Sequence, residues 1–233
     1  MEAARAADAL AQASAALVDA TDVAGFLATL LTSSTGVLHM DAGGILVEDG
    51  NRLDLLAASS HAAVELELHQ SQFDEGPCVD AHVSGRGVSA HGSDLVNRWP
   101  RFGQTMLDSG FSSAHASPLR WHGKPIGAIG WFGRTDTVLR PDEETVAQAF
   151  ADLATLLIVQ TARVDLDTVR RRIQDVLTLR IVIEQAKGVL AWNHGIDMAT
   201  AYELLVQRGA DEGSTLTATA RTVIDEAQNR PII

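Results

Sequence analysis

Few residues of this sequence have the type and spacing that chemistry requires, and Lys187 followed by Gly188 is the clearest case. Both interrupt the apolar pattern of the helical segment RIVIEQAKGVLAWNHG. A glycine inside a helix costs about 1 kcal/mol relative to alanine, so a requirement other than helix formation is expected to place Gly188 there. Three consecutive arginines, at 170 to 172, precede the pair. They form either a local basic face that attracts nucleic acid or a solvated cluster on an ordinary helix.

Catalytic motifs are scarce. The sequence contains no GxxxxGK[ST] phosphate loop, no HExxH zinc motif and no GxSxG nucleophile elbow. Cys78 is the only cysteine, which excludes an intramolecular disulfide and a multi-cysteine zinc site. It follows Gly76 and Pro77 at an expected helix start, where a thiolate is stabilised, but a buried structural cysteine is the simpler interpretation. We expect no enzyme activity, no metal site and no cofactor.

The charge of the chain is unevenly distributed. The net charge is −12, of which −11 belongs to residues 1–162 and −1 to residues 163–233. Acidity argues against nucleic-acid binding by the first two thirds, whereas the last third is nearly neutral. The N-terminus is amphipathic and carries acids, unlike a signal peptide, and no apolar run approaches about 18 residues. We expect a cytoplasmic protein with no membrane partner.

The first two thirds alternate between helical and strand-like patterns. Alanine and leucine recur with helical spacing from about residue 3 to residue 31. Apolar runs then flank Asp49-Gly50 and His122-Gly123, which favour tight hairpin turns, and RGVSAH predicts a further short strand. These patterns predict an α+β unit with an antiparallel sheet flanked by helices. Two long connections, HQSQFDEGPCVDAHVSG and GSDLVNRWPRFGQTMLDSG, are expected to contain short helices and to surround a site.

A long helical run is predicted after Pro141, because neither glycine nor proline follows until Gly188. About 50 residues far exceeds the usual globular helix, so the run is expected either to break once or to project from the body. Residues spaced alternately by four and three, apolar apart from two charged interruptions, are typical of a coiled-coil seam, which favours projection and a homodimer. The alternative is that the same stripe packs on the protein's own C-terminal helices. The stripe consists of Val169, Ile173, Val176, Arg180, Ile183, Lys187 and Leu190.

Two short helices are expected after a stop at His194 and Gly195. DMATAYELLVQRGA directs its apolar residues inward, and STLTATARTVIDEAQ has an apolar face and a cap at Ser214 or Thr215. Two short helices cannot bury both faces without the end of the long one. A three-helix unit is therefore predicted, in a second domain of residues 163–233 that follows a first domain of residues 1–162.

The segment IEQAKGVLAWNHGIDMATAYELL resembles the ANTAR domain, an RNA-binding module of bacterial transcription antiterminators. The resemblance covers roughly residues 167–227, and Glu-Gln-Ala-Lys-Gly at 184–188 is its specific core. It implies a unit that binds paired RNA stem-loops, reads unpaired loop bases and prevents a terminator from forming. Gly188 would then permit close approach of a backbone or a nucleic acid, and Lys187 would project toward phosphate; the alternative is a helix crossing at Gly188 with a solvated Lys187. The implied RNA-binding residues are Arg180, Gln185, Lys187, Gly188 and Arg208.

Upstream, FDEGPCVDAHVSGRGVSAHGSDLVNRWPRF and SSAHASPLRWHGKPIGAIGWFGR resemble a GAF domain of the kind joined to ANTAR in actinobacterial regulators. The resemblance implies a sensor that holds a small molecule, of unknown identity, between its sheet and the connecting loops. Residues 73–82 and 94–111 would form the wall of that site. The implied ligand pocket contains Phe73, Cys78, Trp99, Phe102 and Trp131, although each of these is more often a core residue.

The sequence departs from the ANTAR pattern in the second helix of the unit. Val206, Gly209 and Ala210 lie where the family commonly has Leu-Arg-x-x-Ala-Arg, so two basic positions are lost and salt-dependent RNA affinity is expected to fall. Trp192 either stacks on a base or packs on the core.

These observations predict a GAF–ANTAR regulator that responds to a ligand or partner and binds RNA stem-loops in transcription antitermination, as a homodimer through the long helix. The alternative is a dimeric signalling adaptor with a GAF sensor and a protein-binding helical domain that has lost RNA affinity.

Overall fold

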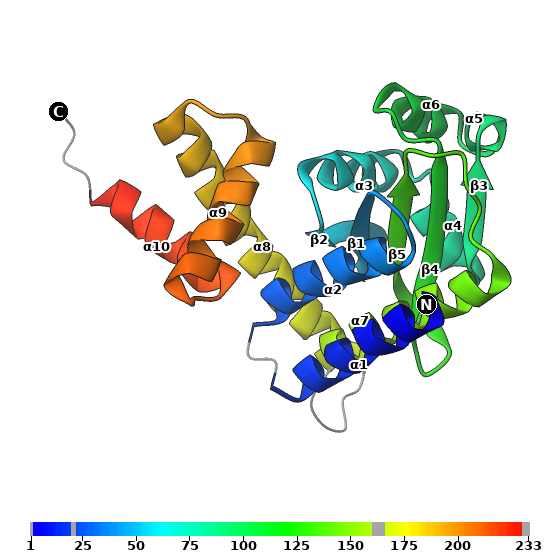
Figure 1. Ribbon diagram of the computed structural model, residues 1–233, viewed down its shortest axis with the longest axis horizontal. Coiled ribbons are helices and arrows are strands. Elements are labelled where there is room, and N and C mark those ends of the chain that lie inside the picture. The colour runs from blue at the N-terminus through cyan, green and yellow to red at the C-terminus, as the bar shows by residue number, and fades with distance from the viewer. Residues whose placement is uncertain (1, 20–21, 160–165, 230–233) are drawn as a thin grey trace.

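The computed structural model describes residues 2–19, 22–159 and 166–229. Within these residues, two helices come first and a five-stranded sheet follows. Helices α3 to α6 lie between strands of the sheet in chain order, and helices α7 to α10 follow the last strand (Figure 1). The predicted α+β class is confirmed. The elements in chain order are α1 (Glu2–Asp19), α2 (Val23–Val37), β1 (Ala42–Asp49), β2 (Arg52–Ala58), α3 (His61–Phe73), α4 (Pro77–Ser84), β3 (Val88–His91), α5 (Ser93–Arg98), α6 (Pro100–Asp108), β4 (Ser113–Trp121), β5 (Lys124–Gly133), α7 (Pro141–Val159), α8 (Leu166–His194), α9 (Met198–Glu212) and α10 (Leu216–Gln228).

The sheet has the strand order β2-β1-β5-β4-β3, and all of its neighbouring strands are antiparallel. Both predicted hairpins are present. Gly50, with a φ of 67°, lies in the β1–β2 turn, and His122 and Gly123, with φ of 49° and 77°, form the β4–β5 turn. Positive φ is why these two turns need glycine or a polar residue that tolerates this conformation.

Each face of the sheet has its own apolar core, because successive side chains of a strand point to opposite faces. On one face Ile129 and Trp131 pack with Phe150 of α7 and with leucines of α2. On the other face Ala128 and Phe132 pack with residues of α3 to α6. The short helices of the two long connections therefore cover one face, and α2 and α7 cover the other (Figure 1).

The long helical run forms two helices, α7 and α8. The residues between them, 160–165, lie outside the described part of the chain, and so does the predicted boundary between residues 162 and 163. Helix α8 does not project from the body, and this prediction is corrected. Ile173 and Val176 are buried in the same core as α7, and Ile183 and Leu190 are buried among α9 and α10. The alternative of packing on the C-terminal helices therefore holds for the second part of the stripe, whereas the first part packs on α7 and the sheet domain; the side chain of Val169 is outside the description.

The end of α8 forms a three-helix unit with α9 and α10, as predicted. Asp197 caps α9 by accepting a hydrogen bond from the Thr200 backbone N–H at 2.8 Å, and Thr215 caps α10 in the same way. Gly195, with a φ of 64°, ends the turn after α8. The unit has its own apolar core, built on Ile183, Ala186, Leu190, Ala201, Leu205, Ala220 and Val223.

The helical unit packs against the sheet domain. Helix α8 contacts β1 and β2, α10 contacts α2, and α9 contacts α3. Ala24 of α2 is buried in the core of the helical unit, and Thr217 of α10 donates a hydrogen bond to Asp22 Oδ1 at 3.1 Å. We call this contact the interdomain seam. It is defined by Ala24, Ala28 and residues 55–58 on the sheet side, and by Arg180, Ile183, Lys187 and Tyr202 on the helical side.

Candidate RNA interface and sensor pocket

The exposed face of α8 contains two of the five residues predicted to bind RNA. Gln185 and Gly188 are both exposed. A Cβ placed on Gly188 would meet no atom of the described residues within 4 Å, apart from its own helix and its chain neighbours. The structural alternative of a helix crossing at Gly188 is therefore wrong. The open position leaves room for a partner that approaches the α8 backbone.

Two exposed apolar side chains share this face of α8. Ile181 is 56% exposed and Trp192 is 88% exposed. Ile181 lies seven residues before Gly188 and Trp192 lies four residues after it, so all three lie on one face of the helix. The sequence did give Trp192 as a candidate base-stacking residue, and the alternative that it packs on the core is excluded. Trp192 therefore presents its flat ring to solvent on this face of α8.

Lys187 lies on a different face of α8, and its predicted solvent exposure is wrong. The side chain is 1% exposed. Its Nζ donates hydrogen bonds to both carboxylate oxygens of Glu184 at 3.0 and 2.9 Å and lies 5.5 Å from the centroid of the Tyr202 ring. Helical periodicity explains this, because Lys187 follows Ile183 by four residues and so lies on the same buried face of α8. The ion pair and the ring partly offset the cost of removing the ammonium from water.

Arg180 accompanies Lys187 at the interdomain seam. Its side chain is partly buried, and the burial lowers the pKa of Arg180, although Glu184 and Asp54 of β2 act in the opposite direction. Both cations line a small hollow together with residues 55–58 of β2. The two positive charges that the sequence predicts for phosphate contact are thus directed at the sensor sheet.

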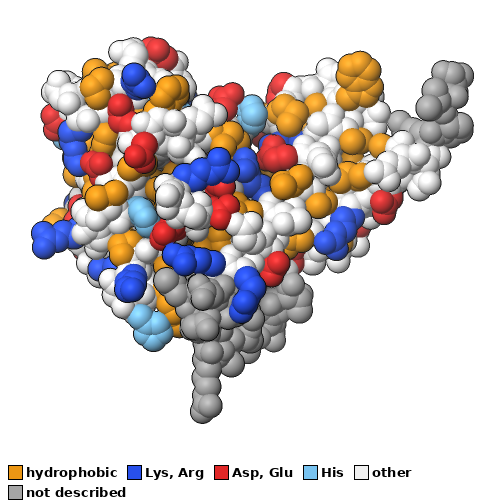
Figure 2. All heavy atoms as spheres, turned by 180° about the vertical axis from the view of Figure 1, so that it is seen from behind, with side chains coloured by type: hydrophobic (Ala, Val, Ile, Leu, Met, Phe, Trp, Pro, Cys, Tyr) orange, Lys and Arg blue, Asp and Glu red, His pale blue; other side chains and the backbone are white. Residues whose placement is uncertain are grey.

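Arg208 is engaged by acids of its own unit. Its Nε donates to Glu212 at 2.7 Å, and its Nη atoms donate to the two oxygens of Glu226 at 2.9 and 2.6 Å. These bonds raise the pKa of Arg208. A phosphate must displace two carboxylates to reach this guanidinium. Positive and negative side chains are also interspersed over the face shown in Figure 2, rather than gathered by sign.

The predicted ligand-pocket residues do not line one pocket. Cys78, Trp99 and Phe102 belong to the core under α3 to α6, whereas Trp131 lies on the opposite face of the sheet, where its Nε1 donates to Ser34 Oγ at 2.8 Å. Phe73 is exposed at the end of α3. The five-residue pocket is therefore corrected. The strand period of two is the physical reason, because Trp131 and Phe132 must face opposite sides.

A polar cluster fills the centre of the face under α3 to α6. Gln70 Nε2 donates to Glu67 Oε2 at 2.7 Å, and the Cys78 thiol donates to Glu67 Oε1 at 3.6 Å. Burial raises the pKa of Glu67 to about 8, and burial together with Glu67 raises the pKa of the Cys78 thiol. A Cβ at Gly130 would lie 2.6 Å from the Cys78 sulfur, so the sheet backbone is in close contact with the cluster. A buried thiol with a raised pKa is a poor nucleophile.

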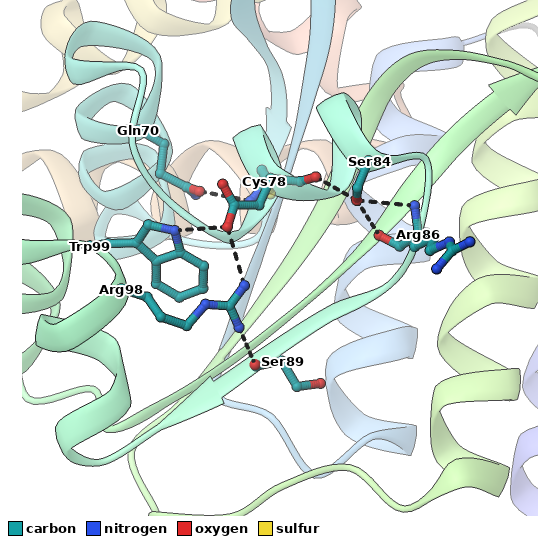
Figure 3. A network of polar contacts seen from close by, with 8 residues as sticks. Gln70, Cys78, Ser84, Arg86, Ser89, Arg98 and Trp99 are labelled. Atoms are coloured by element: carbon teal, nitrogen blue, oxygen red, sulfur yellow. Dashed lines mark hydrogen bonds and ion pairs between the residues drawn. The ribbon is translucent and has the colours of Figure 1, made fainter.

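Asp80 fixes the loop that was expected to form the other wall of the pocket. Its Oδ2 accepts hydrogen bonds from Trp99 Nε1 at 3.1 Å and from Arg98 at 3.2 Å (Figure 3). Arg98 also donates to the Ser89 carbonyl at 2.9 Å and lies over the Trp99 ring. These contacts join α4, β3 and the α5–α6 corner. The buried side chains of the core under α3 to α6 occupy the region between these helices and the sheet.

A larger hollow lies elsewhere, between α2 and α9. This groove has a volume of about 710 Å³, and its walls come from α2, the β2–α3 connection, α9 and the start of α10. Sequence reasoning missed it, because its two walls are distant in the chain and carry no motif.

The helical unit and the sheet domain each match a known family. A model described as ANTAR domain matches residues 171–224, which span most of α8 to α10. A model described as GAF domain matches residues 7–158, more than half of the chain. The chain belongs to the GAF domain family. It also contains an ANTAR domain, so it is a GAF–ANTAR regulator. GAF domains are sensor domains, and ANTAR domains are RNA-binding antitermination domains.

Solved structures agree with the fold of the GAF domain. The GAF domain of a phosphoenolpyruvate-protein phosphotransferase from Coxiella burnetii is 15% identical with a TM-score of 0.55, covering 68% of this chain and 95% of that one. The nlh2 GAF domain of A. aeolicus in an inactive state is 13% identical with a TM-score of 0.52, covering 67% and 97%. The reduced form of fRMsr from Staphylococcus aureus is 14% identical with a TM-score of 0.51, covering 65% and 94%. At these identities the likeness shows the fold alone.

The search of curated proteins returned no match to the GAF–ANTAR regulator. A search of its described helices for a membrane span found none with the necessary length and apolar character.

Proposed function

We propose that this GAF–ANTAR regulator is a ligand- or partner-responsive transcription antiterminator that binds paired RNA stem-loops. The observation that carries the proposal is the ANTAR match over residues 171–224, which falls on a complete three-helix unit with an open glycine on its exposed face. Antitermination follows if the protein holds RNA in stem-loops that prevent a terminator from forming.

The exposed face of α8 is the proposed site of base recognition. Gln185 offers an amide that hydrogen-bonds base edges, Gly188 permits close approach, and Trp192 offers a flat ring for stacking. Unpaired loop bases are the part of a stem-loop that proteins read in this way. Each base stacked on an aromatic ring contributes about 1–3 kcal/mol.

Arg180 and Lys187 contribute in a second state of the molecule. In the arrangement described, the interdomain seam covers both, so their contact with phosphate requires that α8 and β2 separate. A signal received by the GAF domain would shift the balance between a closed and an open arrangement. To reverse a strongly biased equilibrium, the signal must bind the open arrangement about 10⁴-fold more tightly than the closed one.

A substitution at Gly188 tests the proposal directly. Gly188→Gln adds a side chain where there is room, so helix stability should rise by up to about 1 kcal/mol, while close approach of RNA is blocked. We expect the full-length variant to unfold at higher denaturant concentration and to lose retention of a paired-hexanucleotide-loop hairpin at moderate salt. Unchanged RNA binding by this variant would contradict the assigned face.

A second set of measurements compares the hairpin affinity of two tryptophan variants and follows the affinity of the parent as salt is varied. Trp192→Ala should weaken hairpin binding by about 5- to 150-fold, the equivalent of one stacked base, with little effect on stability. Trp121→Ala, at the β4–β5 turn, is the matched control and should leave binding unchanged. Parent affinity must fall steeply as salt rises. If the parent binds no hairpin at any salt concentration, the proposal fails.

A signalling adaptor is the second candidate function. It is favoured by the acids that engage Arg208 and by Val206, which is 44% exposed where the family commonly has a more basic stretch. An adaptor should show no salt-dependent RNA binding. The same salt titration therefore separates the two functions.

A homodimer remains part of the proposal. Because the apolar stripe of α8 is buried within the chain, a dimer through this stripe requires α8 to separate from α7 and the sheet, which also opens the interdomain seam. The dimer should therefore strengthen when Ala24, buried at the seam, is replaced by glutamate. Ala7→Glu, at an exposed site on α1, is the control, and the mass in solution is the measurement.

A further inference from the structure

The groove between α2 and α9 separates the GAF and ANTAR domains on one side of the molecule. Its volume of about 710 Å³ is in the range of small-molecule sites. Phe26, Tyr202 and Val206 supply apolar surface, and hydroxyl groups from α2 and the β2–α3 connection lie between them. This combination suits a compact ligand with an apolar body and a polar end.

The charges of the groove have one dominant sign. Asp22 and Glu203 line it, and neither lysine nor arginine is among its described lining residues. His61 is the sole lining side chain able to gain positive charge, and it lies 3.4 Å from Glu65. A phosphate or carboxylate ligand would meet two carboxylates without a fixed cation. A cation is favoured instead.

Two polar atoms of the groove residues lack hydrogen-bond partners among the described residues. Asp22 Oδ1 accepts from the Gly25 backbone N–H at 3.2 Å and from Thr217 at 3.1 Å, but Asp22 Oδ2 is buried and unpartnered. His61 Nδ1 is likewise buried and unpartnered. Buried polar atoms of this kind are rare and call for a partner. Both residues belong to the wall of the groove.

We infer that the groove between α2 and α9 binds a small organic cation, an amine with an apolar body, and that its occupancy controls the exposure of Lys187. Asp22 and Glu203 select the charge, and Phe26, Tyr202 and Val206 hold the apolar part. This site differs from the space between sheet and helices that the GAF resemblance implied.

Tyr202 connects the groove to Lys187. It lines both the groove and the small hollow at the interdomain seam, and its ring faces the Lys187 ammonium at 5.5 Å. Ala28, Ser60 and Leu216 are also common to both spaces. A ligand that moves the Tyr202 ring therefore alters the cover of Lys187. The regulatory part of this inference rests on the proposed RNA-binding function, whereas the binding part does not.

Ligand binding is tested with three matched probes, N,N-dimethylphenethylamine, 2-phenylethanol and 3-phenylpropionate, which are cationic, neutral and anionic. Tyr202 is the only tyrosine, so the full chain labelled with 3-fluorotyrosine has one fluorine resonance. The amine should shift it saturably, with a dissociation constant on the order of 1 mM for so small a ligand. The carboxylate should bind at least about tenfold more weakly.

Charge-neutral variants complete the binding test. Asp22→Asn with Glu203→Gln keeps the α2 cap and the side-chain shapes, and should weaken the amine about tenfold while leaving 2-phenylethanol unaffected. Asp94→Asn with Asp108→Asn removes two exposed acids of α5 and α6 and is the control. Absence of a saturable shift, equal binding of the anion, or no effect of the groove variant would overturn the site.

The regulatory part is tested by the reactivity of Lys187 toward an acylating reagent, measured relative to Lys124. Saturating amine should raise this ratio at least about threefold, since it exposes the ammonium that Tyr202 covers. If the amine binds but the reactivity ratio stays unchanged, the proposed coupling between the groove and Lys187 is wrong, while the amine-binding site stands. Failure of RNA binding alone would overturn the proposed function and leave both the site and the lysine readout.

Discussion

The face of the sheet under α3 to α6 and the groove between α2 and α9 differ in how completely side chains fill them. The first is the region where the GAF resemblance places a ligand, yet Phe102, Trp99 and the Glu67–Gln70–Cys78 cluster occupy it. The second carries no motif, but it is open, and two polar atoms of its wall have no hydrogen-bond partner among the described residues. The comparison teaches that aromatic residues in a sensor domain indicate its core first, and that an open site arises where two packed units meet.

The largest expected effect on stability comes from removing a side chain of the core under α3 to α6. Phe102→Ala removes a fully buried ring and should lower the free energy of unfolding by about 3–5 kcal/mol. Phe26→Ala in the groove removes a partly exposed ring and should cost less than half as much, about 2 kcal/mol or less. Chemical denaturation of both full-length variants checks the contrast. Equal losses would mean that the two regions are packed alike.

The buried carboxyl of the filled region gives the next effect. The folded-state pKa of Glu67, about 8, is above its unfolded value of 4.5, so unfolding releases a proton between these pH values and stability falls as pH rises. The slope approaches about 1.4 kcal/mol per pH unit between the two pKa values, and the loss between pH 5 and pH 7 is expected to be about 2–3 kcal/mol. Glu67→Gln should lack this component. The parent-minus-variant difference isolates it, and a difference independent of pH would show that the carboxyl is solvated.

A smaller effect of opposite sign is expected from His115. Burial lowers its pKa from 6.5 to about 4, and its ring stacks on Trp131 at 5.9 Å. The neutral form is therefore preferred in the folded protein, and stability is lost as pH falls from 6.5 toward 4. Relative to His115→Asn, the parent should lose about 1 kcal/mol between pH 6 and pH 5. A parent and variant that respond alike to acid would contradict the burial.

Much of the fold follows from local sequence signals. Asp49-Gly50 and His122-Gly123 specify their hairpins through backbone conformation, and Thr215 specifies the start of α10 through its cap. Helix periodicity also identifies the buried stripe of α8. These features depend on neighbours within a few residues, so one segment suffices to predict each of them.

The candidate sites were less predictable, because they depend on partners distant in the chain. Trp131 falls on the opposite face from Phe132, which the strand alternation could have indicated. The placement of Lys187 in the buried stripe was visible as well, but its partner could have been a second chain, α9 or the sheet. The sequence spacing alone does not distinguish these, and the groove exists only because α2 and α9 meet in the fold.

The interdomain seam holds Lys187, the cation of the segment Glu-Gln-Ala-Lys-Gly, away from solvent. The chain has two lysines, and Lys124 at the β4–β5 turn is exposed, so it serves as an internal standard. Acylation of the folded full-length protein, followed by mass spectrometry of each site, measures their relative rates. The account predicts that Lys187 reacts at least about tenfold more slowly than Lys124, because its ammonium is buried and paired with Glu184. Equal rates in the folded protein would contradict it.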